Sequence, residues 1–120
     1  MPDLSQALQG NDFGFFTIIS ELWGLDLQAE DVDSALVELF EKLSNPDLIL
    51  EIYNTLPATS KNALNELLLN KGRMLWALFT RKHGELRIMG RARRDRDKPY
   101  LKPVSATEVL WYRIMISKAF

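Results

Sequence analysis

The residues of this sequence best suited to chemistry are the arginines and lysines of its second half. Residues 73–102 hold ten of the fifteen basic side chains. Guanidinium groups are permanently charged and bind phosphate oxygens in pairs, so this stretch predicts a nucleic-acid contact. The predicted phosphate-binding residues are Arg91, Arg93, Arg94, Arg96 and Lys98, with Arg81, Lys82 and Arg87 extending the patch, and Arg113 joining them only if the last helix enters a groove.

Two aspartates complicate this prediction, because Asp95 and Asp97 alternate with the arginines. In one interpretation they orient the arginines along a nucleic-acid backbone. In the other, Arg–Asp pairs hold the segment against its own domain and nothing binds there. The sequence does not choose between the two interpretations.

The charge distribution favours an anionic partner. Residues 1–60 carry eleven acidic side chains and one basic, a net −10, while residues 61–120 carry five acidic and fourteen basic, a net +9. Halves of such opposite sign suggest a basic binding surface. The alternative is that the two halves face one another and largely neutralise.

Catalysis finds no support in the residue types. The chain has no cysteine and a single histidine, His83, which precedes Gly84 at an expected helix end. Neither Asp31 with Asp33 nor Asp95 with Asp97 makes a convincing metal or acid–base pair. Residues two apart do not share a helix face, and the second pair lies among arginines that would pair with it. No glycine-rich phosphate loop occurs. We therefore expect no enzyme activity, metal, cofactor or small-molecule substrate.

The elements that position the basic residues follow from the spacing of apolar side chains. After a frayed lead-in of about a dozen residues, spacings of three and four predict helices over residues 12–23, 29–43, 46–56 and 59–70. Pro46 suits the first turn of the third helix, and Gly24 suits the end of the first. Among the side chains expected on buried faces are Val32, Phe40, Ile49 and Leu68.

The second half is predicted to contain, in order, a short strand (73–75), a helix (76–83), an extended piece (85–89), a long basic surface loop (90–103) and a last helix (105–117). The loop has no apolar period, and its charge density excludes it from a core. Ser105 and Glu108 have the spacing of a capping box, in which each side chain bonds to the other residue's backbone N–H.

The fold class expected is mainly α: one domain with little or no sheet, made of an acidic helical half (1–56) and a basic half (57–120). No apolar run is long enough for a membrane span, and the start does not resemble a signal peptide, so we expect a cytoplasmic protein with no membrane contact.

The basic half has the element order of a partial winged-helix unit, a helix-turn-helix variant, truncated before its wing at residues 118–120. The sequence of residues 57–120 resembles the N-terminal segment of large bacterial proteins of the XPB-like helicase group. The most distinctive parts are Arg87-x-Met89-Gly90, the Arg93–Arg96 run and Leu110-Trp111-Tyr112-Arg113. The resemblance implies a DNA-associated accessory domain with winged-helix parts, and with it DNA as the expected partner in preference to RNA. No ATPase motif is present, so it does not imply ATP hydrolysis by this chain.

A rival function is protein–protein interaction or dimerisation, with no nucleic-acid role. It would use the aromatic first helix and the apolar last helix as a docking surface for a second copy or for other domains of a longer parent chain. The residues expected on that surface are Phe13, Phe15, Phe16, Trp23, Leu110, Trp111, Met115 and Phe120.

Overall fold

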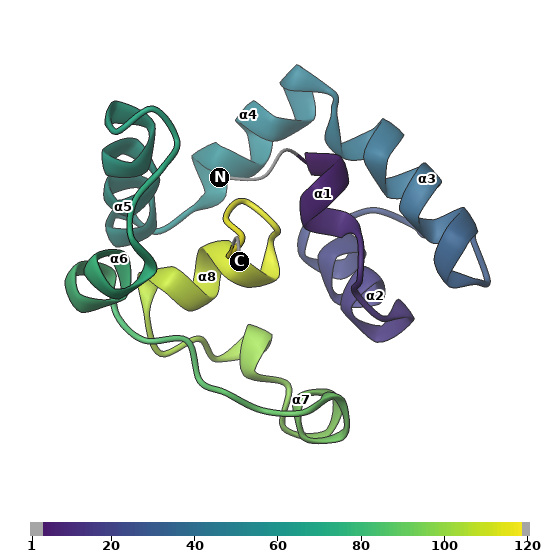
Figure 1. Ribbon diagram of the computed structural model, residues 1–120. Coiled ribbons are helices and arrows are strands. Elements are labelled where there is room, and N and C mark those ends of the chain that lie inside the picture. Colours follow the sequence, from purple (N-terminus) through teal and green to yellow (C-terminus); the bar gives the residue numbers. More distant parts are fainter. Residues whose placement is uncertain (1–3, 119–120) are drawn as a thin grey trace.

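The computed structural model describes residues 4–118, and this part of the chain is helical, with no strand. Figure 1 shows the helices arranged in an arc around a central one, α8. In chain order they are α1 (Leu4–Leu8), α2 (Phe13–Leu22), α3 (Val32–Leu43), α4 (Pro46–Thr55), α5 (Ala58–Leu69), α6 (Trp76–His83), α7 (Arg91–Asp97), the 3₁₀ helix η1 (Pro99–Leu101) and α8 (Ala106–Tyr112).

Five of the predicted helices are confirmed as α2 to α6, and several of their ends follow the expected chemistry. The Asp31 side chain accepts the Ser34 N–H at the start of α3, and Pro46 is the first residue of α4. Gly24 follows α2 with a left-handed φ of 69°. Gly84 ends α6 at φ 101°, where a Cβ would collide with Ser105. These ends are local effects, which is why the sequence alone predicts them.

Three predictions for the connecting segments were wrong. Residues 73–75 form no strand, and the lead-in contains α1, whose Leu8 is fully buried. The supposed loop 90–103 contains α7 and η1. Arginine and alanine are good helix formers, and Arg93 and Asp97 make an i,i+4 pair, so α7 needs no apolar stripe of its own.

The last helix is also shorter than predicted. It ends at Tyr112, and Ile114 takes a left-handed φ of 54°. The indole N–H of Trp23 donates to the Arg113 carbonyl oxygen at 2.9 Å, which satisfies a group that a longer helix would have bonded internally. Lys118 lies in no helix or strand, while the remainder of the expected wing strand, residues 119–120, lies outside the described residues.

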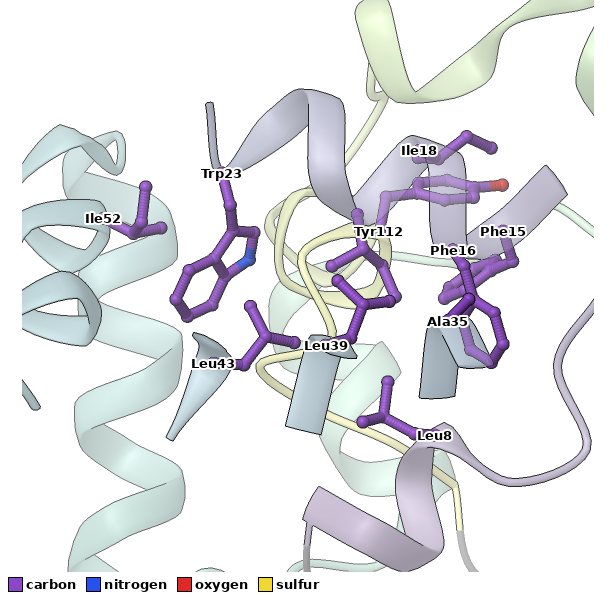
Figure 2. Close-up of a cluster of buried hydrophobic side chains, with 11 residues drawn as sticks. Leu8, Phe15, Phe16, Ile18, Trp23, Ala35, Leu39, Leu43, Ile52 and Tyr112 are labelled. Carbon is purple, nitrogen blue, oxygen red and sulfur yellow. The ribbon is translucent and has the colours of Figure 1, made fainter. Parts of the chain in front are cut away.

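Two clusters of buried apolar side chains form the core, and α8 joins them. The first cluster contains residues of α1 to α4, and Figure 2 shows Phe16, Trp23 and Leu39 within it together with Tyr112 of α8. The second contains Leu56, residues of α5 and α6, and Leu110 of α8. The two clusters correspond closely to the acidic and basic halves. Because α8 packs against both, the halves form one body.

Some side chains expected to be buried are exposed. Val32 and Phe40 of α3, Ile49 of α4 and Leu68 of α5 each keep more than two fifths of their surface in contact with solvent. Residues at these spacings border the buried stripe, but no neighbouring helix covers them. Periodicity alone therefore overestimates how much of each helix is packed.

None of the described helices is long and apolar enough to cross a lipid bilayer.

Candidate nucleic-acid interface

One arginine of α7, Arg94, anchors this helix to the acidic half of the fold. Arg94 is only 8% exposed, and its two terminal nitrogens donate to the two carboxylate oxygens of Asp12 at 2.9 and 2.7 Å. Its Nε donates to Asp95 at 3.0 Å, and its guanidinium lies over the ring of Phe15. This bidentate pair fixes α7 against the start of α2, 82 residues earlier in the chain.

The pairing shifts the ionisation of both partners toward the charged forms. Hydrogen bonding to Arg94 lowers the pKa of the Asp12 carboxyl, although partial burial opposes the effect. Hydrogen bonding to Asp12 likewise raises the pKa of Arg94. A buried guanidinium is stable in this position because its partner stays ionised.

A glycine makes room for this contact. A Cβ at Gly14 would lie 2.7 Å from an Arg94 terminal nitrogen and 2.9 Å from an Asp12 carboxylate oxygen. Both distances are shorter than atoms tolerate without moving. The absence of a side chain at Gly14 therefore allows Arg94 of α7 to approach α2 closely, and backbone flexibility is not the reason for glycine here.

The other cations of α7 face solvent. Arg93 and Arg96 share Asp97, each through Nε only, at 3.2 and 3.1 Å, and their side chains are 59% and 74% exposed. Both terminal nitrogens of each arginine therefore lack a protein partner among the described residues. Arg91 and Lys98 are exposed and form no ion pair within that part of the chain. A basic face of four side chains results, which we call the α7 basic face: Arg91, Arg93, Arg96 and Lys98.

Arg87 has a structural contact. It donates through Nε and Nη2 to Glu108, which also accepts the backbone N–H groups of Arg87 and Val104. Glu108 is fully buried: burial raises its pKa, but hydrogen bonds from Arg87 outweigh this, and the pKa is lowered. Ser105 accepts the Glu108 N–H at 3.0 Å, as the capping box requires. The second bond of the box, in which Glu108 would accept the Ser105 backbone N–H, is replaced: the Glu108 carboxylate accepts the backbone N–H groups of Val104 and Arg87.

The remaining predicted binding residues, Arg81, Lys82 and Arg113, have different environments and do not join the α7 basic face. Lys82 pairs with Glu66 at 2.7 Å, as does His83 at 2.9 Å. Arg81 is exposed and without an ion pair among residues 4–118. Arg113 is partly buried: its Nη1 donates to the Val109 carbonyl oxygen of its own helix, its Nε has no partner, and burial lowers its pKa. Since α8 is the buried central helix, Arg113 does not contribute to the exposed basic face.

The acidic and basic halves do not neutralise one another through contacts. Of the ion pairs among the described residues, Arg94–Asp12 is the only one that joins residues 1–60 to residues 61–120. The other ion pairs formed by cations of residues 61–118 lie within the basic half, so the molecule has a strong charge asymmetry. Asp12 and Glu108, which anchor Arg94 and Arg87, could not be found from the sequence, because no local pattern links them to their partners.

The docking surface of the rival function is largely inside the protein. Phe15, Phe16, Trp23 and Leu110 are buried in the core, and Phe13, Trp111 and Met115 are half-buried against it. Phe120 lies outside the described residues. The aromatic side chains of α2 therefore belong to the core, and any interaction surface must lie elsewhere on the protein.

In residues 4–118, no group of three or more His, Asp or Glu side chains is arranged to hold a metal ion. No family model, curated protein or solved structure matches this chain.

Proposed function

We propose that this chain is a non-catalytic, cytoplasmic accessory domain that binds nucleic-acid backbones, DNA in preference to RNA, through the α7 basic face. One observation carries the proposal: the inward arginine of α7 is anchored by a buried ion pair while the other four cations point to solvent. An anchored helix presents its charges without the entropy loss that a flexible loop would suffer on binding.

The charge asymmetry of the molecule supports the same function. Among the described residues, the only carboxylate of residues 1–60 that pairs with α7 is Asp12, and it binds Arg94 and no member of the α7 basic face. Four cations therefore remain to replace counterions on a phosphate chain. Arg93 and Arg96 each keep the pair of terminal nitrogens that forms bidentate phosphate contacts. Both chemical features are those expected of backbone binding, without sequence readout.

A partial winged-helix unit is the finer part of this proposal. Helices α5, α6 and α8 pack on one another around the second core cluster, as the three helices of such a unit do. In residues 4–118 no strand supplies a wing, and α8 is too buried for a recognition helix. We therefore assign the nucleic-acid contact to α7, which lies in the long connection between α6 and α8. The resemblance to the XPB-like helicase group is in accord with an accessory role.

Fluorescence anisotropy with a labelled non-specific duplex, measured over a series of salt concentrations, tests the proposal. Four phosphate contacts predict a log–log slope of about −3.6. The variant Arg91→Gln/Arg93→Gln/Arg96→Gln is expected to reduce the slope by about 2.7. The control Lys61→Gln/Lys71→Gln/Arg73→Gln removes the same charge outside α7 and is expected to leave the slope unchanged. Equal losses in both variants, or no binding of duplex or single strand in ~50 mM salt, would refute the proposal.

A further inference from the structure

The outer surface of α3 and α4 carries apolar side chains that no part of the described chain covers. These two helices follow one another along the rim of the fold, with α1 and α2 on their inner side (Figure 1). Val37 is 57% exposed and Leu50 59%, and Phe40 and Ile49 are each 42% exposed. Although α4 has ten residues, Ile52 is the only one of them that is buried. We call this surface the α3–α4 face.

Exposed acidic side chains lie about one helical turn or less from these apolar residues along the chain: Asp33 and Glu41 are four residues before and after Val37, and Asp47 is three residues before Leu50. Asp33 and Glu41 lie on the exposed side of α3, and Asp47 and Glu51 on that of α4. None of the four forms an ion pair among residues 4–118, and the single basic residue of the first sixty, Lys42, is bound to Glu38 at 2.8 Å. The α3–α4 face therefore has a local negative charge that nothing in its own half neutralises.

Local helix stability does not explain all of these carboxylates. Asp33 and Asp47 lie in first turns, where the helix dipole favours negative charge. Glu41 lies in the last turn of α3, where the same dipole disfavours a carboxylate. An exposed carboxylate in an unfavourable position beside exposed Val37 and Phe40 is better explained by a partner than by folding.

We infer that the α3–α4 face binds a basic amphipathic helix of another protein. The exposed valine, phenylalanine, isoleucine and leucine would receive the apolar side of such a helix, and the flanking carboxylates its lysines or arginines. A nucleic acid is excluded from this surface by charge. The inference concerns a surface separate from α7, so it stands or falls independently of the proposed nucleic-acid function.

A labelled short amphipathic peptide of leucine and lysine tests the inference by anisotropy. The variant Val37→Ser/Leu50→Ser is expected to raise the Kd about tenfold or more, because two apolar contacts are lost. The variant Glu41→Gln/Glu51→Gln is expected to weaken binding and reduce its salt dependence. The control Leu68→Ser/Leu69→Ser changes two apolar residues of α5 that are more exposed, at 63% and 86%, and is expected to leave the Kd within about twofold.

A peptide with the same composition but no amphipathic helical pattern is expected to bind weakly and with no difference between these variants. Equal binding of both peptides by all variants would reduce the effect to general charge attraction and overturn the inference. Sedimentation gives an independent outcome. If the wild-type chain is a dimer that Val37→Ser/Leu50→Ser converts to a monomer, the α3–α4 face joins two copies and the heterologous partner is refuted. Duplex affinity is expected to be unchanged in both α3–α4 variants.

Discussion

Replacing Asp12 with asparagine isolates the ion pair that anchors α7. The substitution keeps the shape of the side chain and removes its charge, so Arg94 loses its principal partner while remaining 8% exposed. Breaking a fully buried pair destabilises a protein by about 3–5 kcal/mol. Because Asp95 stays within 3.0 Å of Arg94 and the Asp12 side chain is itself 18% exposed, we expect a smaller loss, about 2 kcal/mol.

Urea denaturation followed by far-UV circular dichroism measures this loss. With an m value of about 2 kcal/mol per molar, the urea midpoint is expected to fall by about 1 M. The variants Arg94→Met and Asp12→Asn/Arg94→Met complete a double-mutant cycle, and the coupling energy is expected to be about 2 kcal/mol. The double variant is expected to be more stable than Asp12→Asn alone, because it no longer buries an unpaired guanidinium.

The pH dependence supplies a second readout of the same pair. Pairing lowers the pKa of Asp12 in the folded state, so the folded protein binds fewer protons there than the unfolded chain does. This stabilisation is complete above the unfolded pKa of about 4 and is lost as the pH falls through the folded pKa. The stability difference between wild type and Asp12→Asn is therefore expected to shrink below pH ~4. A coupling energy below about 0.5 kcal/mol, or a difference that does not change with pH, would refute the anchoring role.

Three further predictions test other parts of the structure. Gly14→Ala is expected to lower the free energy of unfolding, measured in urea, by about 1–3 kcal/mol, because the new Cβ would displace Arg94. Alanine is the better helix former, so an increase in stability would show that Arg94 moves without loss. Glu108→Gln is expected to destabilise the fold by about 3 kcal/mol in the same assay, because Arg87 loses a fully buried charged partner; a change below about 1 kcal/mol would show that the amide serves equally well. Leu67→Ala is expected to destabilise the fold by about 2–4 kcal/mol, and Leu68→Ala by no more than about 0.5 kcal/mol, because Leu67 is 5% exposed and Leu68 63%. Equal effects of the two substitutions in thermal unfolding would contradict the assigned buried face of α5.

Segment 90–103 carries local signals for a helix that its apolar pattern does not show. The lack of an apolar period in segment 90–103 predicts a loop. A charged side chain can also anchor a helix to the fold, and Arg94 anchors α7 in this way. The good helix propensity of its arginines and alanine, and the i,i+4 spacing of Arg93 and Asp97, were local signals in favour of α7. The partner of Arg94 was beyond prediction, because Asp12 lies in the other half of the chain and carries no mark of its role.

Local chemistry in the sequence determined the helical class, the placement of α2 to α6 and the Ser105 cap, since apolar spacing, prolines, glycines and capping side chains act within a few residues. It also determined that the two halves carry opposite charge. Only the tertiary structure decided which cations are available to a ligand. Asp12 binds Arg94 in a buried pair and Glu108 binds the guanidinium of the exposed Arg87, while among the described residues Arg91, Arg93 and Arg96 keep free terminal nitrogens in solvent. The tertiary structure likewise decided which apolar side chains remain exposed on α3 and α4. Burial is a property of neighbours brought together by folding, and no spacing within a single helix specifies them.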